Sequence, residues 1–312
     1  MKNSTMTTIK AHNAKFSPSY LPVAVFVGGT SGIGRGIVEA FARSTQGNAN
    51  IIIIGRNHAA AESIIQSLPH PSSPSAKHEF LYCDVTLLKN VIHTTNEILS
   101  RHSRINFLVL SPGVLDFAKV DTEEGLDRNL ALCYYSRWRF IYELAPAMVK
   151  ARAENEDGRV LTVLSAGNGG KIDLDQLGLR NASMMTRVRS IFTYSDLMLD
   201  GFALHYPSLS LIHSYPGVVR TPIGSNSSSF FIRVLSFLTN SRFSPLYYLA
   251  LSAEECGEYQ LNGILYTAST PGPWRIGSDG TDMGKKGYFG SDEARDKLWD
   301  HTLEVTSNKL KV

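Results

Sequence analysis

A strand-like run followed by a glycine turn, Val23-Ala-Val-Phe-Val-Gly-Gly-Thr-Ser-Gly-Ile-Gly-Arg-Gly36, constrains the fold of this chain most strongly. The first five residues are apolar and mostly β-branched, which is typical of a buried strand. After the glycines, apolar residues from Ile33 to Phe41 recur at helical spacing. A strand, a glycine turn and a helix in this order favour dinucleotide binding, because free N–H groups at the helix start can approach a pyrophosphate. A tight turn without a ligand is the alternative interpretation.

The rest of the chain alternates between strand-like and helix-like stretches. Further strands are expected at 51–54, 79–83, 105–110, 159–164, 209–213 and 263–267, a long helix at 121–150 and a last helix at 292–307. This alternation predicts an α/β fold, a single-domain Rossmann-type fold with a doubly wound parallel sheet of about seven strands. The polar residues 1–20 are expected to form a flexible lead-in to one domain over residues 21–312, because no repeat or linker interrupts that stretch.

Composition excludes several classes of protein. The net charge is +3 over 312 residues, and no block of Lys and Arg suggests a nucleic-acid partner. Three distant cysteines without a CxxC motif argue against a zinc site or a disulfide framework, and no metal site is predicted. No apolar run has the length of a signal peptide core at the start or of a transmembrane helix elsewhere. We therefore expect a cytoplasmic protein without an integral membrane segment, and His205 and His213 are expected to be structural.

The residue after the second expected strand bears on the cofactor. Dinucleotide folds that use NAD place an acidic residue here for the ribose hydroxyls, but this chain has Arg56. A guanidinium can pair with a 2′-phosphate, so the sequence favours NADP(H). The alternative is a solvated loop arginine. Ser165 follows the fifth expected strand, at the edge where open α/β sheets bind ligands.

Taken in order, these residues resemble the short-chain dehydrogenase/reductase family from about Val23 to Thr267. The resemblance implies catalytic roles for Ser165, Tyr194 and Asn129, and it implies that the segment with Pro216, Gly217 and Thr221 lines the nicotinamide. The long spacing from Ser165 to Tyr194 is similar to the retinol dehydrogenase-like branch, and the residues around Tyr194 are similar to members from fungal secondary metabolism. The cofactor contacts implied by the resemblance, with Arg56 added from the argument above, are Gly28, Thr30, Ser31, Gly32, Ile33, Gly34, Arg56, Asp84, Val85, Ser111, Gly113, Pro216, Gly217, Val219 and Thr221.

The chain departs from this family at one important position. Met198 stands four residues after Tyr194, where the family has the lysine of its Tyr-x-x-x-Lys pair. A thioether cannot lower the tyrosine pKa or hold the nicotinamide ribose. A neutral Tyr194 could still give a proton to a forming alkoxide, so reduction is favoured over alcohol oxidation. The cations that could replace the lysine are Lys171, Arg180, Arg187 and Arg189, with solvated surface charges as the alternative reading.

The leading functional hypothesis is an NADPH-dependent reductase that acts on a small-molecule carbonyl substrate. The aromatic stretch 226–250 suggests a lid over a bulky apolar substrate, although a core segment and a membrane-facing patch remain open. Two other hypotheses keep the fold: a non-redox isomerase, dehydratase or cyclase, and a non-enzymatic NADP(H)-binding protein. The resemblance also implies pairing through the long helix at 121–150, so a homodimer is one expectation.

Overall fold

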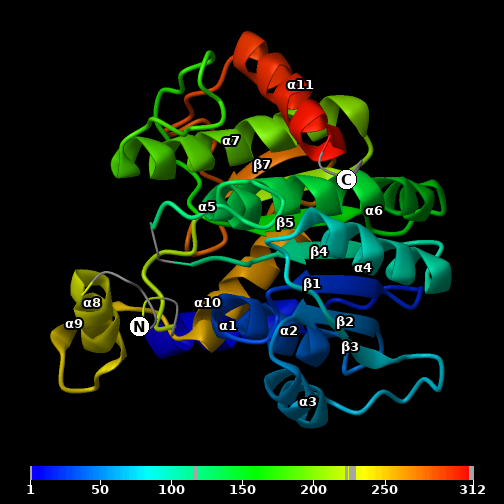
Figure 1. Ribbon diagram of the computed structural model, residues 1–312. Coiled ribbons are helices and arrows are strands. Elements are labelled where there is room, and N and C mark those ends of the chain that lie inside the picture. Colours follow the sequence, from blue (N-terminus) through cyan, green and yellow to red (C-terminus); the bar gives the residue numbers. More distant parts are fainter. Residues whose placement is uncertain (1, 115–117, 222–223, 225–229, 309–312) are drawn as a thin grey trace.

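The computed structural model describes residues 2–114, 118–221, 224 and 230–308. Its centre is one sheet of seven parallel strands in the order β3-β2-β1-β4-β5-β6-β7 (Figure 1). This confirms the predicted Rossmann-type fold. The strands are β1 (Val23–Val27), β2 (Asn50–Gly55), β3 (His78–Tyr82), β4 (Phe107–Leu110), β5 (Arg159–Val163), β6 (Ser210–Ser214) and β7 (Gly272–Ile276).

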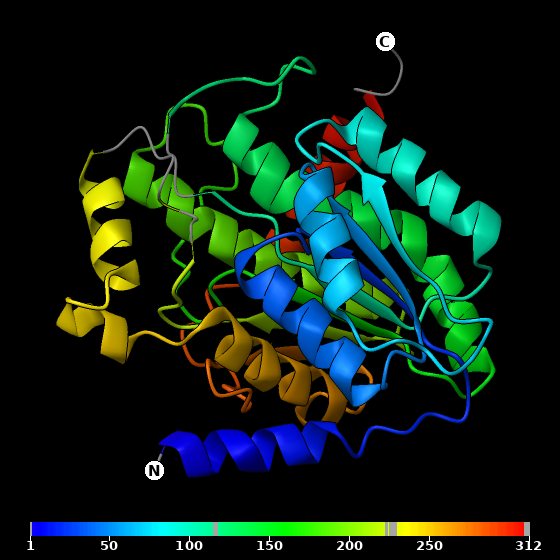
Figure 2. The same cartoon turned by 90° about the horizontal axis from the view of Figure 1, so that it is seen from below.

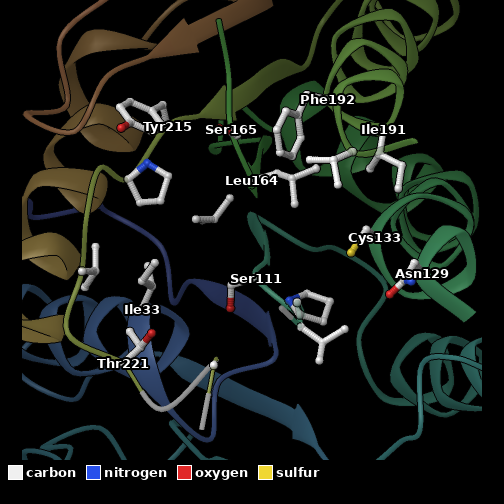
Figure 3. Close-up of a pocket in the computed structure, with 18 of the residues that line it drawn as sticks. Ile33, Ser111, Asn129, Cys133, Leu164, Ser165, Ile191, Phe192, Tyr215 and Thr221 are labelled. Carbon is white, nitrogen blue, oxygen red and sulfur yellow. The ribbon is translucent and has the colours of Figure 1, made fainter. Parts of the chain in front are cut away.

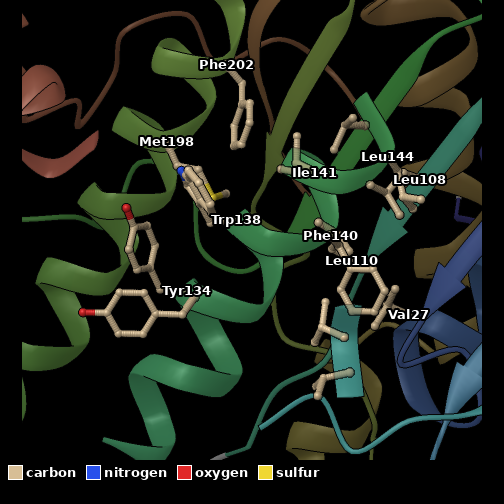
Figure 4. Packing of buried hydrophobic residues seen from close by; sticks show 14 of the residues in the cluster. Val27, Leu108, Leu110, Tyr134, Trp138, Phe140, Ile141, Leu144, Met198 and Phe202 are labelled. Carbon is tan, nitrogen blue, oxygen red and sulfur yellow. The ribbon is translucent and has the colours of Figure 1, made fainter. Parts of the chain in front are cut away.

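Helices cover both faces of the sheet, as Figures 1 and 2 show. The alternation along β1 explains why both faces need cover: Val23, Val25 and Val27 enter one apolar cluster, and Ala24 and Phe26 enter the other. One layer holds α2 (Gly32–Ser44), α3 (His58–Ser67) and α10 (Ala253–Asn262). The other holds α4 (Leu88–Arg101), α6 (Ser136–Ala153), α7 (Met184–His205) and α11 (Asp292–Asn308), with Trp138 and Phe202 packed between helices (Figure 4).

The first residues form a helix and not the flexible lead-in expected from their polarity. Helix α1 (Lys2–Asn13) runs along α10. The Asn13 amide donates to the Glu258 carboxylate at 2.7 Å, and Lys10 Nζ lies 2.6 Å from a carboxylate oxygen of Glu254. The segment is polar because its contacts to α10 are polar, which local composition does not reveal.

The seventh strand also lies outside its predicted position. Residues Gly263–Thr267 form a π-helical turn, η3, that continues α10, and the strand β7 follows at Gly272–Ile276. A short apolar run fits a buried strand and a buried helical turn equally well, so the pattern could not separate them.

The predicted long helix at 121–150 begins later than expected. Asp127 caps its start by accepting from the backbone N–H groups of Asn129 and Leu130, both at 3.0 Å. A short turn α5 (Arg128–Leu130) and a π-helical turn η1 (Ala131–Tyr135) then lead into α6. Residues 121–127 instead form a loop closed by a bridge between Asp121 and Asp127.

Two helices follow β6 in the aromatic stretch 226–250, for which the sequence allows three interpretations: a lid, a core segment or a membrane-facing patch. They are α8 (Phe230–Asn240) and α9 (Pro245–Leu249), and residues 226–229 of that stretch lie outside the described part of the chain. Among the described residues, no helix is both long enough and apolar enough to cross a bilayer.

Candidate active site

A cavity of about 520 Å³ opens at the carboxyl edge of the central strands (Figure 3). The ends of β4, β5 and β6 form its floor, and α7 and α8 form its walls. This is the edge where parallel α/β sheets bind ligands. The structure brings together at this cavity the predicted residues Ile33, Ser111, Gly113, Asn129, Ser165, Pro216, Gly217, Val219 and Thr221.

The glycine turn after β1 is shaped for close approach of a ligand to the backbone. Gly28 and Gly32 adopt positive φ angles of 78° and 54°, which other residues rarely adopt. A Cβ on Gly34 would lie 2.3 Å from Gly28 O and from Ser111 Oγ. Ser31 stands at the N-cap of α2 without a side-chain capping bond. The Ser31 side chain therefore leaves the first N–H groups of α2 uncapped, and the turn fits a dinucleotide pyrophosphate.

The residues predicted to hold the adenosine end lie beside the cavity and do not line it. Arg56 is exposed at the end of β2, next to the glycine turn: a Cβ on neighbouring Gly55 would lie 2.9 Å from the Thr30 side chain. Val85 is buried, and Asp84 accepts from the backbone N–H of Thr86 at 3.0 Å. The ends of β2 and β3 thus lie next to the glycine turn, on the side that faces away from the cavity.

Ser165 is held at the end of β5 by a buried polar network. Its backbone N–H donates to His213 Nε2 at 3.3 Å, so the proton of the neutral ring is on Nδ1, which lies 2.7 Å from Asp196 Oδ1. The second carboxylate oxygen of Asp196 lies 3.5 Å from Arg275. The Ser165 hydroxyl accepts from the Asn168 amide at 3.1 Å. His213 and Asp196 thus hold in place the backbone of Ser165. This is a structural role for His213, as expected, but the sequence did not indicate that it supports Ser165.

The structure does not bring Tyr194 to this cavity. Its side chain has no exposed surface, and its hydroxyl donates to the backbone oxygen of Leu177 at 3.0 Å. Burial raises its pKa above the ordinary value of tyrosine. Met198 is buried in the same apolar cluster. The placement therefore does not support the proton-donor role that the sequence resemblance implied for Tyr194.

Helix geometry explains the difference. The face of α7 that lines the cavity carries Val188, Ile191 and Phe192 (Figure 3 labels the last two). The α7 residues that line the cavity all lie between Met184 and Phe192, in the first part of the helix, and Tyr194 follows them. The Tyr194 ring packs between α7 and η1 against Tyr134. Spacing along the chain matched the family motif, but tertiary packing sets which part of the helix meets the cavity.

One of the four cations considered as a replacement for the lysine reaches the cavity. Arg187 is buried in its wall and pairs with the Asp127 carboxylate. Arg180 is exposed and lies 3.6 Å from Asp121, and Lys171 and Arg189 are exposed. Because Arg187 is already neutralised by Asp127, it adds little positive potential to the cavity.

A second buried arginine at the cavity was not found from the sequence. Arg137 on α6 is fully buried and donates to the backbone oxygens of Leu110 at 2.8 Å and Pro112 at 2.6 Å, and to the Thr162 hydroxyl. Burial lowers its pKa to about 10, so the side chain remains protonated at neutral pH. Among the described residues no carboxylate pairs with it, and neutral oxygen acceptors hold its charge. Only its position one turn after Cys133, itself one turn after Asn129, could have suggested it.

The described part of the chain contains no group of three or more His, Cys, Asp or Glu side chains that could hold a metal ion.

Asn129 lines the cavity from the capped start of α5, where its amide lies 3.5 Å from the backbone oxygen of Ala118. The polar groups at the cavity are therefore hydroxyls, an amide, a thiol and arginines.

Comparisons with known proteins agree with this architecture. The family model for short chain dehydrogenases matches residues 22–173. Oxidoreductase andH of the fungus Emericella variicolor is 31% identical over 240 residues, 77% of this chain and 68% of that protein. Polyprenol dehydrogenase of Homo sapiens is 24% identical over 217 residues, 67% of this chain and 64% of that protein.

Solved structures show the same fold at low sequence identity. The RhlG/NADP active-site complex of Pseudomonas aeruginosa superimposes with a TM-score of 0.60 at 16% identity, covering 83% of this chain and 95% of that one. The resemblance inferred from the glycine turn, Asn129, Ser165 and the Pro216 segment is confirmed by the sequence relatives. This chain belongs to the short-chain dehydrogenase/reductase family of oxidoreductases.

Proposed function

We propose that this protein is an NADPH-dependent reductase that acts on a carbonyl group of a fairly bulky, apolar small molecule. The observation that carries the proposal is the cavity itself, which joins the glycine turn to Ser165 within a mostly apolar wall. A volume of about 520 Å³ suits a substrate of drug-like size or larger. Val188, Ile191 and Phe192 would contact its apolar body.

The residues present fit a nicotinamide dinucleotide. Gly28–Gly34 and the start of α2 would hold the pyrophosphate, Asp84 and Val85 would flank the adenine, and Arg56 would bind the 2′-phosphate. Ser111, Gly113, Pro216, Gly217, Val219 and Thr221 would border the nicotinamide half. When bound, the reduced cofactor supplies the hydride.

Ser165 is the proposed hydrogen-bond donor to the substrate carbonyl oxygen. The hydroxyl is half-buried at the cavity floor, and the His213–Asp196 network holds its backbone in place. The buried charge of Arg137 favours negative charge developing on that oxygen. Because the product alkoxide and the Ser165 alkoxide have similar proton affinities, the Ser165 hydroxyl can also give its proton to the product oxygen. The Ser165 alkoxide left behind would take a proton from solvent through cavity water that Asn129 supports.

Arg56→Ala is expected to weaken NADPH binding by about 10- to 100-fold, the value of a charge-assisted hydrogen bond, and to leave NADH binding nearly unchanged. The measurement is calorimetric titration with NADPH, NADP⁺, NADH and NAD⁺. Arg104→Ala is the matched control. Arg104 precedes β4, so it lies at the edge formed by the amino ends of the strands, away from the glycine turn, and its guanidinium lies 3.3 Å from the Glu156 carboxylate. Equal loss for both nucleotide pairs would refute a role in 2′-phosphate recognition, and no binding of any nucleotide would refute the reductase.

A second candidate is a family member that catalyses a reaction without net redox change. The observation that favours it is the cavity-facing side of α7, where Val188, Ile191 and Phe192 occupy the wall and neither Tyr194 nor Met198 does. Incubation with a panel of bulky ketones and aldehydes separates the two. Loss of NADPH absorbance in step with alcohol formation supports the reductase, whereas product without a change in absorbance supports the second candidate.

A further inference from the structure

Among the described side chains of α8, three apolar ones are exposed and two polar ones face the cavity. Phe237 is 70% exposed, and Val234 and Leu238 beside it are also exposed. Ser236 is buried and Thr239 is half-buried, and both line the cavity. A surface helix in water normally turns its large apolar side chains toward the protein. The outer side of α8 is therefore suited to an apolar surrounding.

The next turn and helix also expose large apolar side chains. Phe243 is fully exposed, and Tyr248 and Leu249 of α9 are about as exposed as Phe237. We call these six residues the apolar face: Val234, Phe237, Leu238, Phe243, Tyr248 and Leu249. Figures 1 and 2 both show α8 and α9 standing out from the side of the molecule. A gathering of large exposed apolar side chains marks an interaction surface more often than chance exposure.

The segment that carries the apolar face bears charge of one sign, with its Arg220 lying 3.7 Å from Glu255 at the start of α10. The sequence contains no Asp or Glu between Asp200 and Glu254, and it contains three arginines there. Arg233 and Arg242 are exposed. Arg220 holds α9 in place, since its Nη1 donates to the backbone oxygens of Tyr247 at 2.6 Å and Ala250 at 2.8 Å. The face therefore combines aromatic and aliphatic groups with positive charge, which complements an anionic lipid surface.

The cavity opens on this side of the molecule. Met184, at the start of α7, and Val218, after β6, line the cavity and are more than half exposed. The start of α7 and helix α8 both line this cavity and lie on the same side of the molecule (Figure 1). The cavity mouth thus has apolar residues on its rim, next to the apolar face.

We infer that α8 and α9 dock on the surface of a bilayer that contains anionic lipid. The apolar face inserts into the interface while Arg233 and Arg242 meet lipid phosphates or carboxylates, and the cavity mouth then faces the membrane. If the proposed reductase is correct, its apolar substrate enters from the bilayer. A second copy of the chain or a protein partner would explain the apolar residues, but neither requires the absence of acidic residues across the whole segment.

The test is co-sedimentation of the full chain with vesicles of phosphatidylcholine alone and of an equal mixture with phosphatidylserine. We expect binding to the mixed vesicles that weakens without phosphatidylserine and with added salt. The double variant Phe237→Ser with Phe243→Ser should bind about 30-fold more weakly or worse, because it removes two inserting rings. Arg242→Glu should lose about tenfold on the mixed vesicles only.

Leu204→Ser is the matched control. Leu204 is 62% exposed on α7 but lies near the opposite end of that helix from the cavity. The Leu204→Ser variant should bind vesicles as the unchanged protein does. Circular dichroism melts establish that every variant is folded. No vesicle binding by the unchanged protein, or equal binding by the double variant, overturns the inference. A concentration-dependent dimer that the double variant loses, without vesicle binding, would assign the face to a second copy. The assay uses neither substrate nor cofactor, so its outcome is independent of the proposed reaction.

Discussion

Ser165→Ala is expected to lower NADPH-dependent carbonyl reduction by about 10²- to 10⁴-fold, the usual contribution of a positioned acid or hydrogen-bond donor. The hydroxyl is half-buried at the cavity floor, and its removal leaves the substrate oxygen without that donor. Steady-state rates measure the effect, and calorimetry should show NADPH binding unchanged because the cofactor turn is untouched. Stability should change little, since the hydroxyl accepts its hydrogen bond from the amide of Asn168, an exposed residue.

Tyr194→Phe provides the contrasting result. The structure buries this side chain away from the cavity, so turnover should stay within about twofold of the unchanged protein, too small a change for a lost proton donor. The variant leaves the backbone oxygen of Leu177 without its donor at 3.0 Å and should cost about 1–3 kcal/mol of folding free energy. A large loss of turnover at normal stability would show that Tyr194 reaches the substrate, and would contradict the site described above.

Gly36→Ala is expected to destabilise the protein by at least about 2 kcal/mol, although alanine normally stabilises a helix interior by about 1 kcal/mol relative to glycine. The steric effect dominates because the new Cβ would lie 2.0 Å from Ala253 O on α10. That atom belongs to the backbone, so the overlap can be relieved only by moving the helix. Gly257 lies against Gly36 from the other side, where an added Cβ would be 2.2 Å from the Gly36 carbonyl carbon. Urea unfolding measures the change.

Gly178→Ala is the control for this experiment. Nothing lies within 4 Å of a Cβ at Gly178, and its φ angle is not in the positive range that penalises alanine. Its stability should therefore stay within about 0.5 kcal/mol of the unchanged protein. If Gly36→Ala were as stable as this control, α2 and α10 would not pack as closely as the structure shows.

Local sequence patterns were sufficient for most of the fold. The apolar runs at Val23–Val27 and 51–54 can be buried on both sides only in a covered parallel sheet, and the structure places them as β1 and β2. The glycines at 28, 32 and 34 reflect backbone requirements that no other residue meets easily, so the cofactor turn was recognisable. The patterns failed where a segment depends on a distant partner: α1 depends on polar contacts to α10, and η3 continues a helix through a strand-like run.

The sequence by itself determined that this chain forms a parallel sheet with a dinucleotide turn and presents Ser165 at its carboxyl edge, because these properties follow from residue types at fixed local spacing. Only the tertiary structure decided which part of α7 meets the cavity. Packing against η1 buries Tyr194 and Met198, and Val188 and Phe192 lie at the wall. The tertiary structure also decided that Arg137, on a different helix, is a buried cation beside the cavity that no carboxylate among the described residues neutralises. A helix pattern fixes the relative positions of side chains, but the neighbours against which the helix packs decide which of them meet a cavity.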